Sequence, residues 1–209
     1  MASTDFTIDE SLITKVTDYI REYMSNYDPS HDFSHIQRVV NLARRIQATE
    51  PSTSLPIVTL CALLHDVGDR KYLKPGQDAT RMIKDLLVSY GVPKPLADKI
   101  QTICLGVSYS TEVKDPARVV ELIKLHPELA VVQDADRLDA IGAVGIGRCF
   151  TFGGAKNRAM DDSIEHFAEK LVKVEGMMKT EMGRKLARDR TARIEQMQEW
   201  WRLEVEDSA

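Results

Sequence analysis

Residues 55–64 form an almost uninterrupted apolar stretch that stops at the adjacent pair His65-Asp66, and this stretch constrains the fold most strongly. Its apolar residues cover nearly the whole circumference of a helix, which is the pattern of a helix buried on all sides. A short buried strand is the alternative, but the run from Leu55 to His65 is long for a strand. Imidazole and carboxylate groups are costly to bury without partners, so the pair predicts a cluster of interacting polar groups.

Helical periodicity continues through most of the chain, and no stretch shows the alternation of a half-buried strand. Asp9 and Asp32 precede the first two apolar patterns, at 12–24 and 36–46, and are the expected N-cap residues. Residues 147–159 combine glycines with basic side chains, and we interpret them as a loop. The sequence therefore predicts an all-α fold. We expect the remaining helices at 55–65, 76–90, 93–108, 116–124, 128–145, 161–177 and 180–205.

The length of 209 residues suits one domain with a single hydrophobic core. Hydrophobic residues make up 43% of the chain and charged residues 29%, a balance typical of a globular protein and not of a disordered one. We therefore predict a single domain over residues 1–209, with a core at about 7–160 and C-terminal helices at about 161–205 packed on it.

Composition also limits the classes of partner. A net charge of −4 argues against a nucleic-acid binder with a broad basic face, and no apolar run approaches the roughly 20 residues of a membrane span. Cys61, Cys104 and Cys149 are too widely spaced for a zinc knuckle, and we expect free thiols. No secretory signal is visible, so the expected location is the cytoplasm. The sequence predicts no particular oligomeric state.

Two further candidate metal ligands, His35 and Asp136, lie far from His65-Asp66 in the sequence. Each alone has a commoner explanation, because a histidine on a helix face usually forms a hydrogen bond and a lone aspartate usually caps a helix or forms a salt bridge. Together, two imidazoles and two carboxylates are a mixed nitrogen and oxygen donor set that suits a divalent transition metal. An octahedral metal held this way keeps open positions, which can hold water and an oxygen of a substrate.

The order of these residues, a histidine, a His-Asp pair and a final aspartate, resembles the ligand signature of the HD-domain metal-dependent phosphohydrolases. Residues 31–39 and 134–143, with Asp69 and Lys71, are similar to the small single-domain branch of this family. That branch includes bacterial proteins similar to nucleoside-triphosphate pyrophosphohydrolases. The resemblance covers about residues 7–205 and implies a helical HD-domain bundle.

The resemblance also implies that His35, His65, Asp66 and Asp136 are the metal ligands. Cyclic-nucleotide phosphodiesterases and the oxygenase relatives of this fold bind two metals, with additional histidines between the His-Asp pair and the final aspartate. Here only His126 lies in that interval. The sequence therefore favours one divalent transition metal per chain, with manganese, cobalt, nickel, iron and zinc all open.

Asp69, three residues after Asp66, matches the position of an acidic residue that assists the reaction as a general acid or base in related HD hydrolases. A continuing helical turn would make these two carboxylates neighbours. The alternative is a surface carboxylate paired with Arg70. Lys71 is the second predicted catalytic residue, because its positive charge is placed to reach a bound phosphate.

Arg38, Arg148 and His31 are the predicted substrate-binding residues. Arg38 lies three residues after His35 and so shares its helix face, and arginine suits bidentate contact with phosphate. His31 precedes the N-cap of the same helix and is expected near the substrate or behind His35. A structural salt bridge is the alternative for each arginine.

Other basic residues have structural explanations as well as functional ones. Lys156 and Arg158, in the expected glycine-rich loop, are further candidates for phosphate contact. Arg137 is expected to pair with Asp134 or Asp139 and so to hold the helix that carries the last ligand.

The predicted activity is hydrolysis of a nucleotide or a related small phosphorylated metabolite. Nucleoside-triphosphate pyrophosphohydrolase is one option and nucleoside 5′-monophosphatase is another. A non-catalytic sensor that binds metal or nucleotide is the alternative class, because ligands alone do not prove turnover.

Overall fold

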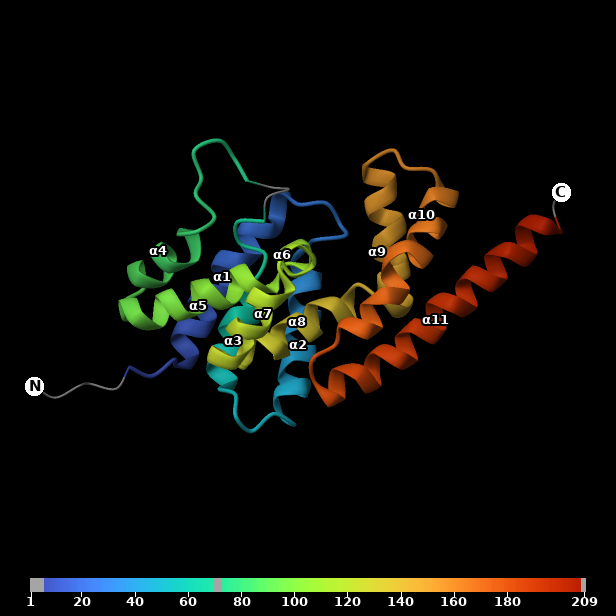
Figure 1. Cartoon of the computed structure of the whole chain (residues 1–209). Helices are drawn as coiled ribbons and strands as arrows, with labels where there is room; N and C mark the ends of the chain where they lie inside the picture. The colour runs from blue at the N-terminus through green and yellow to red at the C-terminus, as the bar shows by residue number, and fades with distance from the viewer. Residues whose placement is uncertain (1–5, 70–72, 208–209) are drawn as a thin grey trace, which may run out of the picture.

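The computed structural model describes residues 6–69 and 73–207, and within these ranges every regular element is a helix (Figure 1). The predicted all-α class is therefore confirmed. The elements are α1 (Glu10–Tyr23), a 3₁₀ turn (Met24–Asn26), α2 (Phe33–Gln47), α3 (Leu55–Leu64), α4 (Met82–Ser89), α5 (Lys94–Val107), α6 (Tyr109–Lys114), α7 (Pro116–Leu125), α8 (Glu128–Asp139), α9 (Gly142–Ala155), α10 (Met160–His166), a π-helical segment (Phe167–Leu171), a 3₁₀ segment (Val172–Met177) and α11 (Glu181–Glu206).

Helix α3 lies at the centre of the bundle, as its apolar composition predicts. It packs against α1, α2, α5 and α8, and its residues are buried from Val58 to Leu64. Leu60 and Leu64 are fully buried, and burying such a side chain stabilises a fold by about 1.5–3 kcal/mol. Because this helix is enclosed on all sides, His65 at its C-terminal end is placed inside the protein.

Two aspartate caps fix where α1 and α2 begin, and both agree with the sequence prediction. Asp9 Oδ1 accepts a hydrogen bond from Leu12 N (2.8 Å), and Asp32 Oδ1 accepts one from His35 N (3.2 Å). A cap of this kind stabilises a helix by about 1 kcal/mol. The Asp32 cap also holds His35 in the first turn of α2, which packs on α3 and α8.

The boundary between α8 and α9 differs from the predicted one. The sequence pattern predicts one helix over 128–145 and a loop over 147–159, whereas two helices meet at a sharp turn. Gly142 makes the turn, because its φ of +73° lies in the left-handed region that favours glycine. A Cβ on Gly145 would lie 2.3 Å from the carbonyl oxygen of Ala140. The loop prediction was wrong because the glycines allow α9 to start close against the end of α8.

Two other helices also depart from their predicted ranges, and α6 was not expected. The helix predicted at 76–90 begins later, where Gln101 of α5 caps it: Gln101 Oε1 accepts hydrogen bonds from Ile83 N (3.0 Å) and Lys84 N (3.1 Å). A cap from another helix leaves no local signal in the sequence. The helix predicted at 161–177 is helical throughout, but only its first part is α-helical.

Helices α9, α10 and α11 stand beside the bundle formed by the preceding helices, and α11 runs past them to the C-terminus (Figure 1). The buried Asp134 of α8 accepts hydrogen bonds from Thr180 N (2.8 Å), Thr180 Oγ1 (2.7 Å) and Lys179 N (2.8 Å) at the start of α11. Further along α11, Arg190 donates a hydrogen bond to the carbonyl oxygen of Leu138. The C-terminal helix is thus bonded to α8 at two points.

Cys61 and Cys104 are buried and Cys149 is half-buried, and all three are free thiols, as predicted. None of the helices in the described ranges combines the length and the apolar composition needed to cross a membrane.

Candidate metal centre

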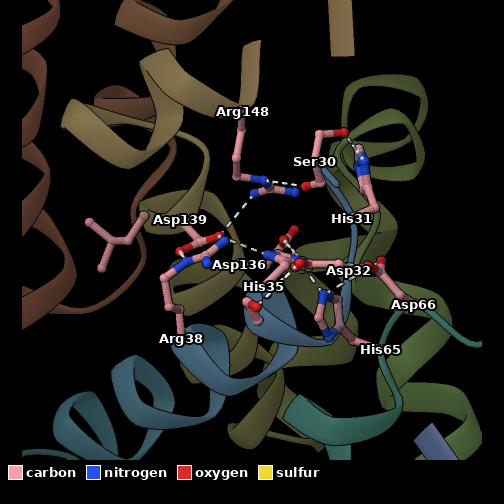
Figure 2. A network of polar contacts seen from close by, with 12 residues as sticks. Ser30, His31, Asp32, His35, Arg38, His65, Asp66, Asp136, Asp139 and Arg148 are labelled. Atoms are coloured by element: carbon pink, nitrogen blue, oxygen red, sulfur yellow. Dashed lines mark hydrogen bonds and ion pairs between the residues drawn. The ribbon is translucent and has the colours of Figure 1, made fainter. Parts of the chain in front are cut away.

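Four polar side chains converge where α2, α3 and α8 meet (Figure 2). His35 comes from the first turn of α2, His65 ends α3, Asp66 follows it directly, and Asp136 lies in the last turn of α8. The packing of the three helices brings these residues together from distant parts of the sequence. They are the four residues that the sequence predicts as metal ligands.

The imidazole and carboxylate atoms of this cluster face one another at close but not bonding distances. His35 Nε2 lies 3.4 Å from Asp66 Oδ2 and 3.6 Å from Asp136 Oδ1, while His65 Nε2 lies 3.5 Å from Asp66 Oδ1 and 3.6 Å from Asp136 Oδ1. A hydrogen bond between such atoms is usually about 2.7–3.2 Å long. His35, His65 and Asp66 each offer one ligand atom within 4.8 Å of the others, so they form a candidate metal site.

Both histidines are held with Nε2 directed at the cluster. His35 Nδ1 lies 2.8 Å from Asp139 Oδ2, and His65 Nδ1 lies 2.9 Å from the carbonyl oxygen of Ala62. Carboxylate and carbonyl oxygens accept hydrogen bonds, so each Nδ1 carries a proton and donates it. In the neutral rings, the Nε2 lone pairs therefore face the carboxylates, which is the arrangement that a metal-binding histidine requires.

The cluster also contains buried polar atoms that the described chain does not satisfy. Nε2 of His65 and Oδ2 of Asp66 are buried and have no hydrogen-bond partner within the described residues. Such an atom costs about 1–3 kcal/mol, and more when it is charged. A divalent cation bound by both atoms would remove this cost, so the donor set fits a metal ion.

Comparison with known proteins places the chain in a family. The family model of the HD domain matches residues 32–141. Protein YpgQ of Bacillus subtilis is 34% identical over 183 residues, which is 84% of this chain and 85% of YpgQ. The chain belongs to the HD-domain family.

Solved structures of similar proteins have the same fold. The crystal structure of Bacillus subtilis YpgQ in complex with ADP has a TM-score of 0.72 and 36% identity, covering 91% of this chain and 97% of that chain. A protein from Lactobacillus plantarum has a TM-score of 0.79 and 29% identity, covering 96% and 100% of the two chains. An HD-superfamily hydrolase from Bacillus thuringiensis has a TM-score of 0.73 and 30% identity, covering 96% and 99%.

Opposite charges dominate the electrostatics of the cluster formed by His35, His65, Asp66 and Asp136, which we call the HD cluster. Burial alone would lower the pKa of His65, but Asp66 and Asp136 raise it to about 10. Burial alone would raise the pKa of the Asp66 and Asp136 carboxyls, but His65 and His35 hold both below their usual range. In the metal-free protein His65 is therefore a cation between two carboxylates at neutral pH.

Metal binding to the HD cluster at pH 7 is expected to release a proton, because a protonated His65 cannot coordinate. Calorimetric titration with Mn²⁺ in buffers of different ionisation enthalpy measures this proton directly. The apparent affinity should rise as pH increases toward about 10, the pKa of His65. Heats that do not depend on the buffer would contradict the prediction.

Asp139 is a residue of the HD site that sequence reasoning did not assign to it. Its carboxylate is 1% exposed and lies 2.8 Å from His35 Nδ1. Arg38 donates to both of its oxygens, through Nε (2.7 Å) and Nη2 (3.0 Å), and Arg148 donates through Nη1 (3.1 Å). Burial would raise the pKa of Asp139, but His35 and Arg38 hold it well below its usual range. Asp139 thus fixes the orientation of a predicted ligand.

The prediction that Arg137 pairs with Asp134 or Asp139 was wrong, because Arg137 pairs with Glu112 instead. The available signal for Asp139 was its spacing: it lies three residues after Asp136 and therefore on the same face of α8.

Asp139→Asn is expected to lower the affinity for metal by about 10–100-fold, the usual effect of removing a group that orients a ligand. The amide keeps the shape of the side chain but removes the charge that holds Arg38 and Arg148. Competition with a fluorescent chelator measures the affinity. Asp98→Asn is the matched control, since Asp98 forms an ion pair with Lys84 on the α4–α5 side of the bundle. If the affinity for metal is unchanged, Asp139 only links α8 to α2 and α9 and does not orient a metal ligand.

The three predicted substrate-binding residues all lie at this site (Figure 2). Arg38 and Arg148 approach it from α2 and α9 and share Asp139, and Arg148 Nε also donates to the carbonyl oxygen of Ser30 (2.7 Å). The His31 ring lies 6.1 Å from the His35 ring, measured between centroids. Two guanidinium groups around one carboxylate leave a surplus positive charge beside the cluster.

The predicted catalytic residues follow the end of α3. Gly68 has a φ of +83° and turns the chain, so the expected helical relation between Asp66 and Asp69 is wrong. Instead, Asp69 N donates to the carbonyl oxygen of Asp66 (3.2 Å), which keeps Asp69 beside the cluster. The pKa of Tyr27 is raised by burial, by Tyr23 and by the charges of Asp66 and Asp69. Lys71 lies outside the described residues.

Proposed function

We propose that this chain is a metal-dependent phosphohydrolase that acts on a nucleotide or a related small phosphorylated metabolite. One observation carries the proposal: buried Nε2 of His65 and Oδ2 of Asp66 lack hydrogen-bond partners within the described residues, inside a two-histidine, two-carboxylate cluster. Membership of the HD family, whose relatives include an HD-superfamily hydrolase, supports it.

In this proposal, His35, His65, Asp66 and Asp136 hold one divalent transition metal, and manganese, cobalt, nickel, iron and zinc all suit the donor set. When bound, such a metal polarises a phosphoryl oxygen and makes water more acidic. Residues of the chain would transfer the protons and bind the substrate. Asp69 would accept the proton of the attacking water or return one to the leaving oxygen.

The proposed substrate contacts are the basic groups around the cluster. Arg38 and Arg148 are each held by Asp139, so they present a fixed positive charge to a phosphate bound beside His35. His31, whose Nδ1 lies 2.7 Å from Ser30 Oγ, lines the same side as Arg148. Lys71 is proposed as a further phosphate contact because of its position two residues after Asp69.

A nucleotide is the favoured substrate class, because Bacillus subtilis YpgQ was crystallised with ADP. Within this class we favour hydrolysis of a nucleoside triphosphate to a monophosphate and pyrophosphate. Hydrolysis of a nucleoside 5′-monophosphate is the alternative, and the two release different products.

The test is a panel of nucleoside mono-, di- and triphosphates, each incubated with Mn²⁺, Co²⁺, Ni²⁺ or Mg²⁺ and assayed separately for phosphate and pyrophosphate. We expect activity with a transition metal and release of pyrophosphate from a triphosphate. Phosphate from a monophosphate would instead identify a monophosphatase. Nucleotide binding without turnover under every metal would make the chain a sensor and refute the proposal.

A further inference from the structure

One face of α9 leads away from the metal centre and carries basic and aromatic side chains. Arg148, Phe152 and Lys156 follow one another at intervals of four residues, which places them on the same side of the helix and of its C-cap. Arg148 marks the end of this face at the metal centre, where it contacts Asp139 (3.1 Å). Lys156 marks the other end.

A continuous chain of ring and cation contacts joins this face to the cluster. The His31 ring lies 6.1 Å from the His35 ring and 5.9 Å from the Phe152 ring. Lys156 Nζ lies 5.7 Å from the Phe152 centroid, and Arg158 Cζ lies 5.8 Å from it. The Phe152 ring therefore contacts two cations, and His31 links this ring to the predicted ligand His35.

These two cations differ from the arginines at the centre because no carboxylate of the described residues pairs with them. Arg38 and Arg148 share Asp139, whereas neither Lys156 nor Arg158 forms an ion pair within the described ranges. Near Arg158, burial, Lys170 and Arg158 lower the pKa of His166, while Glu169 raises it. A pair of uncompensated cations is unexpected in a chain with a net charge of −4.

We propose that Lys156 and Arg158 bind the phosphates of the substrate that extend beyond the one at the metal centre. The pair makes the site selective for polyphosphate chains over single phosphates. An arginine offers paired N–H donors to phosphate oxygens and a lysine offers a point charge, so together they suit two adjacent phosphates. This inference rests on the proposed function for the position of the reacting phosphate.

The simpler explanation is that both cations serve only the helix. Lys156 is the C-cap residue of α9, where a positive charge interacts favourably with the helix dipole. Both cations also gain from the face of the Phe152 ring. These roles predict a loss of thermal stability when the charges are removed, but no preference between ligands. Ligand preference is therefore the decisive measurement.

The test compares two probes, inorganic tripolyphosphate and orthophosphate, by calorimetry on the Mn²⁺-loaded full chain at one fixed free Mn²⁺ concentration. The variant combines Lys156→Gln with Arg158→Gln. We expect its affinity for tripolyphosphate to fall by roughly 10- to 100-fold, the usual size of charge-assisted contacts, and its affinity for orthophosphate to stay nearly unchanged. A second variant, Lys156→Arg with Arg158→Lys, keeps both charges and should keep most of the affinity for tripolyphosphate.

The matched control combines Arg44→Gln with Arg45→Gln. These exposed residues also carry two charges at the C-terminal end of a helix, but lie roughly 14 Å along α2 from His35. The control should bind both probes as the unchanged protein does. Equal losses for both probes in the glutamine variant, no loss for either, or a full loss in the charge-preserving variant would overturn the inference.

Binding is measured without turnover, so the two proposals can fail separately. If the chain hydrolyses no nucleotide yet prefers tripolyphosphate through these two residues, the proposed function fails and the inference stands. If it hydrolyses nucleotides and the glutamine variant keeps its preference, only the inference fails.

Discussion

Replacing either His65 or Asp136 with alanine is expected to leave the chain without bound transition metal. His65 Nε2 and Asp136 Oδ1 lie 3.6 Å apart and face the other two predicted ligands, so each substitution removes a donor from the centre of the cluster. Elemental analysis after dialysis against a low concentration of Mn²⁺ should show a fall from about one ion per chain to almost none. The expected loss of metal is large because each variant keeps only three of the four predicted ligands.

Thermal melting gives a second measurement of the same prediction. A ligand that binds only the folded state, at a concentration of 100 times its Kd, adds about 2.7 kcal/mol of stability. Mn²⁺ should therefore raise the Tm of the unchanged protein and leave the Tm of both variants where it was. His166→Ala is the control, since His166 is part of α10 and outside the cluster. Normal metal content in both variants would refute the ligand assignment.

Asp69→Asn is expected to lower kcat by roughly 10²–10⁴-fold, the usual contribution of a general acid or base, while metal content stays nearly normal. The two effects separate because Asp69 is beside the cluster but not in it: its backbone N–H donates to the carbonyl oxygen of Asp66 after the turn at Gly68. Steady-state kinetics at saturating Mn²⁺, paired with elemental analysis, measures both quantities.

Asp85→Asn is the matched control for Asp69→Asn. Asp85 is an exposed carboxylate of α4 that pairs with Arg81, the N-cap residue of that helix, at 3.5 Å, and its loss should leave kcat unchanged. If Asp69→Asn also turns over normally, then Asp69 is a structural carboxylate and proton transfer has to be assigned elsewhere.

The predicted ligands could be recognised from the sequence because His65-Asp66 and His35 have informative neighbours, and because the ordered set that they form with Asp136 resembles a family signature. His65-Asp66 ends an apolar helix that is buried on every side, where an unpaired polar residue is costly. His35 follows an N-cap aspartate, and the cap could be predicted from residue type alone. Helix type and caps depend on neighbouring residues, and this is why the all-α fold could be predicted.

Asp139 and the path of α9 depend on contacts between distant residues and could not be predicted in this way. Two partners of Asp139, His35 and Arg38, lie on α2 about a hundred residues earlier in the sequence. Its spacing from Asp136 places it on the same face of α8, but this spacing does not reveal those two partners. Glycines in α9 resemble a loop in composition, but Gly145 is there because Ala140 lies against it. Local propensity is a weak guide where tertiary packing decides.

The hydrogen bonds between α8 and the start of α11 bear on whether residues 32–141, the region that matches the HD family model, can keep their structure without the C-terminal helices. A fragment that stopped at residue 141, where the match to the family model ends, would lack the donors of residues 179–180 and of Arg190. The carboxylate of Asp134 would then lose its hydrogen-bond donors from residues 179–180, and α8 would lose its contacts with α11. Asp136 is two residues further along. Helix α11 therefore supports the helix that carries Asp136, although it contributes none of the four predicted metal ligands.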